Sequence, residues 1–394
     1  MNTLRLAWRY VIYHRVKSIA MIASIALTVS LPIAIHLLLT QFNEQIGARS
    51  KSTPVVVGAK GSRLDLTLSA LYLENKCDAQ IAYGEVKEIR KTGYGKAIPI
   101  SLGFTAQDFS IVGTRLDYFE LRDLDFASGS AFRRLGDCVI GAEVARILEV
   151  GVGDEIKSDR TNSLDIASTP PLYMRVTGVL KRTKTADDKA VFVDLKTSWL
   201  LAGLGHGHED LADESGIKIL GRDGKTTIAS AAVVSEMRIT EKNLDSFHFH
   251  GDDTDFPITA VIVVPTGDAQ RSKNLLESRY LQPDFQTQLV EPQTVVEELM
   301  GLVFRAKQFF DANAIIISMG TFLLLVMVIV LSLKLREREM ETMFKIGCSR
   351  TTIIKLQCAE LLIIGFASAI LIGIIVAAVS MTAGEIVQSL LIRG

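Results

Sequence analysis

Residues 312–333 read ANAIIISMGTFLLLVMVIVLSL and contain no charged side chain. An α-helix rises about 1.5 Å per residue, so a run of this length crosses a hydrocarbon core about 30 Å thick. Two further runs have the same character, at residues 18–39 and 361–381. A buried core helix would explain one such run, but three in one chain predict transmembrane helices.

The first of these runs could instead be a cleaved signal peptide. Its apolar core exceeds the usual length of about 7–15 residues, and no small-residue cleavage pattern follows it cleanly. We therefore expect an uncleaved membrane anchor at residues 18–39.

The composition predicts a globular domain beside the membrane helices. Hydrophobic residues make up 48% of the 394, yet 22% are charged, and the mean hydropathy is +0.28. The net charge of −1 argues against a nucleic-acid partner. We expect an α-helical membrane protein with three transmembrane helices and a large extracytoplasmic α+β domain inserted between helices 1 and 2. The expected boundaries are 1–43 for the basic N-terminus and helix 1, 44–304 for the outer domain, and 305–394 for helices 2 and 3.

Basic residues set the expected orientation, because Lys and Arg concentrate in cytoplasmic loops. Four precede the first run, with no acid among them: Arg5, Arg9, Arg15 and Lys17. Six more occupy the loop 334–359. We therefore expect both segments in the cytoplasm, and residues 44–304 and the short tail after residue 381 outside it.

The outer segment alternates strand-like and helix-like stretches. Short apolar stretches bounded by Gly, Pro and Asp predict strands at 96–104, 172–180, 190–195 and 256–265. Helical patterns predict helices at 141–150, 268–281 and 292–304, the last with Pro292 at its start.

The loop 334–359 has more residues and charge than a simple connection needs. Met340, Met343 and Phe344 are spaced i, i+3, i+4, which gives an apolar stripe on a charged helix. Gly347 can end this helix and Ser349 can cap the next one. Such a helix can dock into a partner protein, or it can lie passively on the membrane surface.

Four histidines form two His-x-His pairs in the outer segment: His206 with His208, and His248 with His250. Residues i and i+2 of a strand share a face, so both imidazoles of a pair could reach one ion. Imidazole with nearby carboxylate suits zinc or a related metal. The alternative is two polar loops that happen to contain histidine. Cys77 and Cys138 also lie outside, where oxidising conditions permit a disulfide, but their spacing does not decide whether one forms.

We find no motif for catalysis in the chain itself. The stretch GRDGKTT at 221–227 lacks the earlier glycine of a phosphate-binding loop. G-x-S-x-G, H-E-x-x-H and C-x-x-C are all missing from the sequence. We therefore expect that the chain is not an enzyme.

Several stretches resemble the MacB/FtsX-like ABC transporter permeases, the mechanotransmission type. LREREMETMFKIGCSRTTIIKLQCAELL at 335–362 is similar to the family's segment after its second span. The stretches at 111–132 and 139–156 resemble the family's outer-domain core. Residues 54–73 resemble one bacterial branch, in which an outer His-rich loop also occurs. The matching positions of the first stretch are Arg336, Glu337, Arg338, Glu339, Gly347, Cys348, Ser349, Arg350 and Glu360.

This resemblance implies a permease subunit in the inner membrane of a Gram-negative cell. A separate cytosolic ATPase would bind ATP and magnesium, and a second permease copy or a paralogue would complete the complex within the lipid. ATPase closure would move the outer domain and drive export or extraction of a substrate. The implied ATPase-coupling residues are Glu339, Met340, Met343, Phe344, Gly347, Ser349 and Arg350.

Two other outputs fit the same architecture. The outer domain could pull on a periplasmic partner such as a cell-wall hydrolase, or it could sense a metal or another ligand. Family members usually have four spans, whereas residues 381–394 contain Glu385 and Arg393 and are too few to cross. We expect a three-span variant, a fourth helix from another chain, or a shortened chain.

Overall fold

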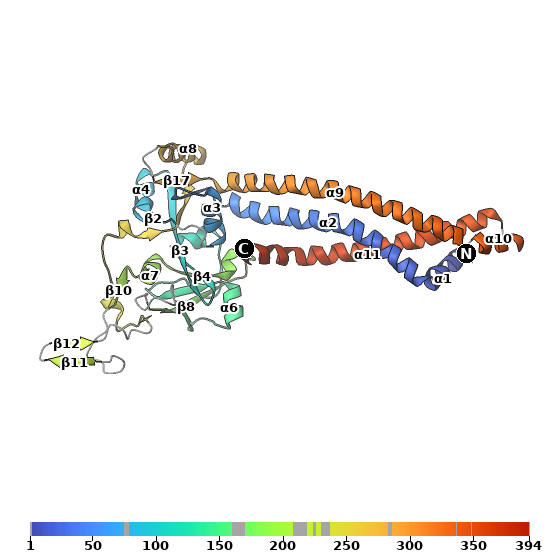
Figure 1. Cartoon of the computed structure of the whole chain (residues 1–394). Coiled ribbons are helices and arrows are strands. Elements are labelled where there is room, and N and C mark those ends of the chain that lie inside the picture. Colours follow the sequence, from blue (N-terminus) through green and yellow to red (C-terminus); the bar gives the residue numbers. More distant parts are fainter. Residues whose placement is uncertain are drawn as a thin grey trace. The chain divides into compact units, whose positions relative to one another are not determined.

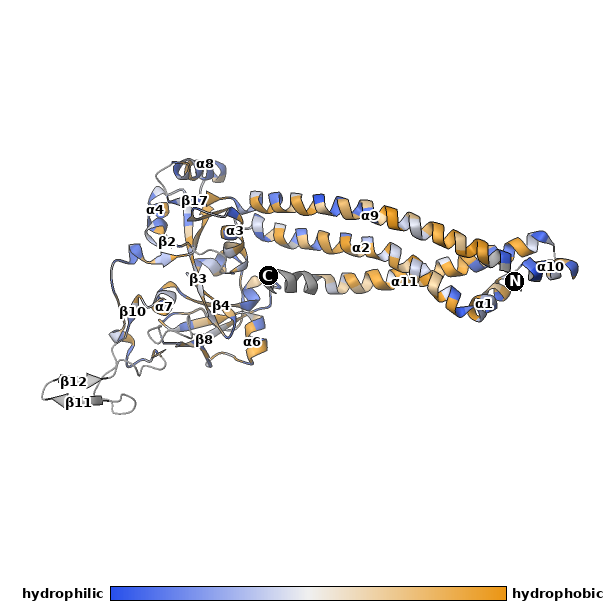
Figure 2. Cartoon of the chain, viewed as in Figure 1, coloured by the Kyte–Doolittle hydropathy of each residue, from blue (hydrophilic) through white to orange (hydrophobic). Residues whose placement is uncertain are grey.

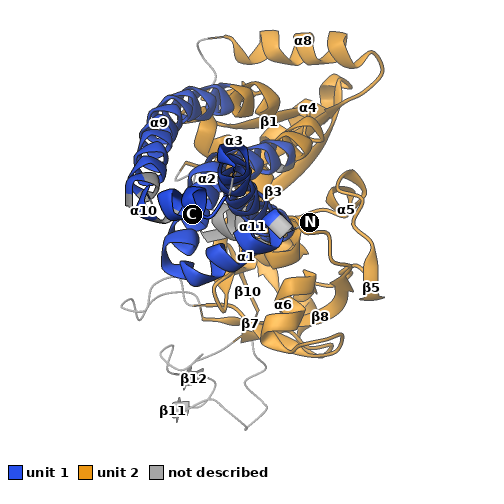
Figure 3. Cartoon of the chain, turned by 90° about the vertical axis from the view of Figure 1, so that its right-hand side faces the viewer, with its two compact units in different colours: residues 1–46, 298–394 blue, residues 47–297 orange. Residues whose placement is uncertain are grey.

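The computed structural model describes residues 2–74, 79–159, 170–207, 219–223, 226–229, 237–282, 286–335, 337–347 and 349–393. The chain folds as two units, coloured separately in Figure 3. Unit 1 comprises residues 1–46 and 298–394, and unit 2 comprises residues 47–297.

Unit 1 is helical. Its elements are α1 (Asn2–Tyr13), α2 (Arg15–Lys51), α9 (Pro292–Leu335), α10 (Glu337–Lys345) and α11 (Arg350–Arg393). Three of these helices, α2, α9 and α11, are long and apolar enough to cross a membrane, as the sequence predicts. Figure 2 shows the apolar residues running along these three helices.

Two helices are longer than the sequence patterns indicate. The expected helix at 292–304 and the expected span at 312–333 are one continuous helix, α9. Arg305, Lys307 and Gln308 between them are good helix formers, and Lys307 pairs with Asp311 one turn later, so the helix continues. Likewise α11 continues through the expected tail to Arg393.

Polar contacts and a small apolar core hold the described parts of unit 1. Lys17 Nζ, near the start of α2, lies 3.4 Å from a carboxylate oxygen of Glu360 in α11. The Thr28 hydroxyl donates to Thr321 of α9 at 3.3 Å. Val11, Met21 and Ile364 pack together, so α1, α2 and α11 share a core.

Unit 2 is built on one mixed sheet, whose strands appear in the left part of Figure 1. The strand order is β13-β8-β6-β9-β4-β3-β16-β1-β17, and β5 and β7 also pair with β8. The sheet strands are β1 (Val55–Ala59), β3 (Gly95–Ala106), β4 (Phe109–Thr114), β5 (Phe126–Gly129), β6 (Asp137–Ile140), β7 (Glu155–Lys157), β8 (Leu172–Leu180), β9 (Ala190–Asp194), β13 (Met237–Arg238), β16 (Ala260–Pro265) and β17 (Thr287–Val290).

Smaller elements complete unit 2. The helices are α3 (Arg63–Tyr72), α4 (Gly84–Thr92), α5 (Asp117–Leu121), α6 (Ala142–Leu148), α7 (Leu195–Leu201) and α8 (Ala269–Tyr280), with 3₁₀ turns η1 (Ala186–Lys189), η3 (Leu244–Ser246) and η4 (Asp253–Asp255). Three two-stranded ribbons are formed by β10 (Gly205–His206) with β14 (His248–Phe249), β11 (Ile219–Asp223) with β12 (Thr226–Ala229), and β15 (Pro257–Ile258) with β2 (Ile81–Ala82).

Both faces of the sheet are buried around β1. Val56 belongs to one core with Leu66 of α3. Its neighbours Val55 and Val57 belong to a second core with Ile89 of α4. Successive side chains of a strand point to opposite faces, so a strand covered on both sides is apolar at every position.

The expected strands match the structure closely. The stretch at 172–180 is β8, 96–104 lies within β3, and 190–195 contains β9. The stretch at 256–265 divides at Thr259 into β15, which pairs with β2, and β16, which pairs with β3. Cys138 is a free thiol buried in β6, so it is in no disulfide, and Cys77 lies outside the described residues.

The last turn of α2, from residue 47 onward, belongs to unit 2 and carries a buried arginine. Arg49 Nη1 lies 2.6 Å and Nη2 3.1 Å from the two carboxylate oxygens of Asp187 in η1. Only 8% of the Arg49 side chain and 2% of the Asp187 side chain are exposed. Arg49 Nε donates to the Leu71 carbonyl, and Nη2 also donates to the Tyr118 hydroxyl at 3.2 Å. We call the ion pair of Arg49 with Asp187 the clasp.

Two hydroxyl groups complete the coordination of Asp187. The hydroxyl of Tyr118 donates to one carboxylate oxygen and that of Thr185 to the other, each at 2.7 Å. Burial raises the pKa of the Asp187 carboxyl, but the charge of Arg49 and these hydrogen bonds outweigh it and hold that pKa well below its ordinary value. Burial, with the nearby Asp187 charge, raises the pKa of Tyr118 to about 12, so the phenol remains a donor.

A glycine allows η1 to hold Asp187 in place. A Cβ on Gly141 would lie 2.3 Å from the carbonyl oxygens of both Asp187 and Asp188. No side chain fits at that distance, so the backbone of η1 packs directly on the residue that precedes α6. Gly141 lies in the stretch 139–156 that resembles the family core.

We expect Asp187→Asn to lower the free energy of unfolding of unit 2 by about 3 kcal/mol at pH 7, because it leaves Arg49 buried without a counter-charge. The folded-state pKa of Asp187 is depressed, so its contribution is present above pH 4 and is lost as the pH falls. When the pH falls from 7 to 3, the free energy of unfolding should therefore decrease by about 1 kcal/mol more in the wild type than in the variant.

Denaturant unfolding of the full chain in detergent measures this difference. In a Trp8→Phe background, Trp199 is the only tryptophan, and it is buried in unit 2. If the free energy of unfolding depended on pH equally in the wild type and the variant, Asp187 would not be held as an ion in the folded state.

Candidate functional site

The charged loop of the sequence folds as a short helix, α10, between the two long helices α9 and α11. Met340 and Met343 of α10 are half-buried, and Gln357 of α11 donates from Nε2 to the Met340 sulfur at 3.4 Å. Phe344 is 51% exposed on this helix. The predicted apolar stripe therefore has one methionine, Met340, in contact with α11 and an accessible aromatic ring on Phe344.

A glycine ends α10. Gly347 has a φ of +102°, which strains any residue with a side chain, although no atom lies within 4 Å of a Cβ placed there. Its N–H donates to the Phe344 carbonyl at 3.0 Å. The sequence prediction that Gly347 ends the helix is confirmed, and the reason is the backbone angle.

Ser349 caps α11. Its hydroxyl accepts from the Thr352 N–H at 3.3 Å, as the sequence predicts. The guanidinium carbon of Arg350 lies 5.5 Å from the centre of the Phe344 ring, so a cation–π contact closes the turn. We call α10 with Gly347, Ser349 and Arg350 the elbow. Arg336, Cys348 and the side chain of Glu339 lie outside what the structure describes.

Glu360, the last residue of the resembled segment, has a structural partner that the sequence did not indicate. It is buried in α11 and pairs with Lys17 of α2. The helix that follows the elbow is therefore connected to the helix that carries the clasp residue Arg49. Sequence analysis also missed the clasp, for which an arginine at the end of an apolar helix was the only signal.

Three of the four predicted metal-ligating histidines lie together. His206 of β10 pairs directly with His248 of β14, and His250 completes the group. His208 lies outside the described residues.

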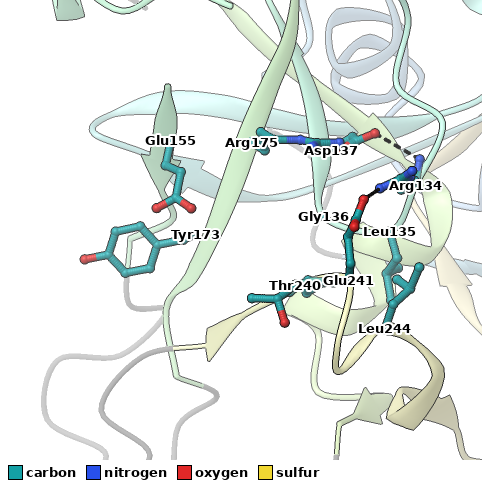
Figure 4. A pocket seen from close by; sticks show the side chains of 11 residues that line it. Arg134, Leu135, Gly136, Asp137, Glu155, Tyr173, Arg175, Thr240, Glu241 and Leu244 are labelled. Carbon is teal, nitrogen blue, oxygen red and sulfur yellow. Dashed lines mark hydrogen bonds and ion pairs between the residues drawn. The ribbon is translucent and has the colours of Figure 1, made fainter. Parts of the chain in front are cut away.

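A cavity of about 100 Å³ lies beside β6 and β8 (Figure 4). Arg134 pairs with Glu241 at 2.6 Å, and Arg175 pairs with Asp137 at 2.8 Å. Within the cavity wall these two arginines and two carboxylates therefore neutralise one another.

Comparison with known proteins gives one family. Residues 18–236 match the MacB-like periplasmic core domain. No curated protein matches the chain. Among solved structures, the periplasmic region of MacB from Actinobacillus actinomycetemcomitans is 11% identical with a TM-score of 0.35, and the match covers 63% of this chain and 92% of that one. The extracellular domain of the noncanonic ABC-type transporter YknZ from Gram-positive bacteria is 11% identical with a TM-score of 0.33, covering 60% and 98%.

We expect Gly347→Ala to destabilise the elbow by about 1 kcal/mol, because a Cβ is disfavoured at positive φ. This cost corresponds to about fivefold faster hydrogen exchange of the α10 amides. Gly301→Ala is the matched control, since Gly301 lies inside α9 with no atom near its Cβ position. If the α10 amides exchanged hydrogen at the same rate in the wild type and in Gly347→Ala, the turn would not depend on the positive φ of residue 347.

Proposed function

The chain belongs to the MacB-like periplasmic core domain family, and from this premise we propose that it couples a cytosolic ATPase to movement of its periplasmic domain. Family membership makes it an ABC transporter permease-type component, a membrane protein with a periplasmic domain. ATP hydrolysis would occur in the separate partner subunit, because no phosphate-binding loop occurs in this sequence.

The observation that carries the proposal is the elbow. A half-exposed Phe344 stands on a short charged helix whose end is fixed by Gly347 and whose successor is capped by Ser349. Aromatic residues are frequent anchors in the pockets of partner proteins. The charged and exposed side chains around it, Glu337, Arg338, Glu341 and Lys345, suit the polar rim of such an interface.

A contiguous series of contacts supports transmission from the elbow. The elbow leads directly into α11, whose Glu360 pairs with Lys17 of α2. The helix α2 continues to Arg49. The clasp, the ion pair of Arg49 with Asp187, holds this end of the helix to the periplasmic domain. Force on the elbow would therefore reach the periplasmic domain through α11, one ion pair and α2.

The proposed output is export or extraction of a substrate at the periplasmic side of the inner membrane. Two permease copies would pair, each with one ATPase, and ATP-driven closure would change the spacing of the periplasmic domains. The described parts of the three long helices have no row of charged side chains suited to a hydrophilic channel. Domain movement fits this feature better than passage through a wide pore.

We expect Phe344→Asp to abolish co-purification of an ATPase with the full chain from native membranes, because a carboxylate cannot fill an apolar pocket. ATP hydrolysis recovered with the chain should fall at least about tenfold, which corresponds to about 1.4 kcal/mol of lost binding free energy. Leu116→Asp is the matched control, since Leu116 is 52% exposed in the periplasmic domain.

Recovery of the ATPase with the control but not with Phe344→Asp would locate the contact at the elbow. Equal recovery with all three forms would remove the elbow from the interface, and no ATPase with the wild type in any mild detergent would contradict the proposal as a whole.

A further inference from the structure

The ribbon of β10 and β14 places three imidazoles on one side. His206 lies directly opposite His248 in the antiparallel register, a position where side chains are neighbours. His250 follows His248 by two residues, so it lies on the same side of the strand. The backbone N–H of His250 donates to the Leu204 carbonyl at 3.1 Å and extends the pairing of the two segments.

The other side of the ribbon is apolar and explains why the histidines face outward. A Cβ on Gly205 would lie 2.7 Å from the Phe249 ring, and one on Gly207 would lie 2.7 Å from the Phe247 ring. The sequence Gly-His-Gly therefore accommodates Phe-His-Phe, with rings over the glycines. Phe249 also contacts the buried Phe256, their ring centres 6.1 Å apart, which fixes the ribbon to the core.

The imidazoles form a nearly equilateral triangle. Their ring centres are 4.7, 4.8 and 4.8 Å apart. One nitrogen from each ring can be chosen so that all three lie within 4.8 Å of one another. His250 Nε2 is 3.3 Å from His206 Nδ1. Two nitrogens bound to one tetrahedral zinc ion, each at about 2.0–2.1 Å, lie about 3.3 Å apart.

We propose that His206, His248 and His250 bind one Zn²⁺ or a related divalent transition metal on the periplasmic domain. Neutral imidazole suits zinc, copper and nickel, whereas calcium and magnesium prefer oxygen ligands. Three protein ligands leave one position of four-coordinate zinc for water or another donor, and the group at that position can exchange. His206 and His250 are exposed and His248 is half-buried, which gives the ion access from solvent.

The binding of zinc would tie two distant segments together. His206 follows α7, whereas His248 and His250 follow η3, about forty residues later in the chain. A metal held by both segments would fix β10 against β14 and stabilise the folded periplasmic domain in proportion to its occupancy. This inference does not rest on the proposed ATPase coupling, because it concerns only side chains of unit 2.

The test is zinc titration of the full chain, purified in detergent without a polyhistidine tag and stripped of metal with a chelator. Competition with a chromogenic chelator should show zinc binding that His206→Ala, His248→Ala and His250→Ala each weaken at least about tenfold. His14→Ala is the matched control, because His14 lies between α1 and α2 in unit 1, outside the cluster. In the Trp8→Phe background, Trp199 fluorescence verifies that unit 2 of each variant is folded.

Cobalt provides a second reading of the same site. The wild type with Co²⁺ should show the visible absorption of a tetrahedral nitrogen site, and each of the three variants should lose it. Equal zinc binding by the wild type and a folded triple variant would overturn the proposal. So would a wild type that binds no zinc, since the 3.3 Å contact would then be a hydrogen bond between two imidazoles.

Discussion

The ion pair between Arg49 and Asp187 is the constraint on which the architecture depends. Burying two charges is costly unless each is paired and hydrogen-bonded, and here two arginine nitrogens and two hydroxyl groups surround one carboxylate. The pair fixes the last turn of a long apolar helix to η1, and Gly141 keeps η1 in place. In the proposed coupling, this attachment would let the helix act on the sheet of unit 2.

In unit 1, the proposed contact with the ATPase lies at the elbow. The elbow combines an exposed aromatic ring, a turn that requires glycine and a capped helix start. In the cavity beside β6 and β8, Arg134 pairs with Glu241 and Arg175 pairs with Asp137. The residues that carry the proposed coupling are those that hold helices at their ends, at the elbow and at the clasp.

Local patterns in the sequence predicted the local structure. The three apolar helices, the turn at Gly347 and the cap at Ser349 each depend on a few consecutive residues. The pairing of Arg49 with Asp187 joins residues 138 positions apart, and that of Lys17 with Glu360 joins residues 343 apart, so no local pattern could reveal them. The histidines show both cases: spacing predicted that His248 and His250 share a face, but only the register of β10 with β14 brings His206 beside them.

The central claim is that α2 carries movement to the periplasmic domain through the clasp. Distances between spin labels at Leu116→Cys of two copies, with the native cysteines replaced, measure that movement in the complex with its ATPase. The double change Arg49→Met and Asp187→Leu replaces the pair with apolar side chains, which such a site tolerates. We predict that ATP changes the label distance with the clasp intact and leaves it unchanged in the double variant, although the ATPase remains bound. An equal change in both would contradict the account.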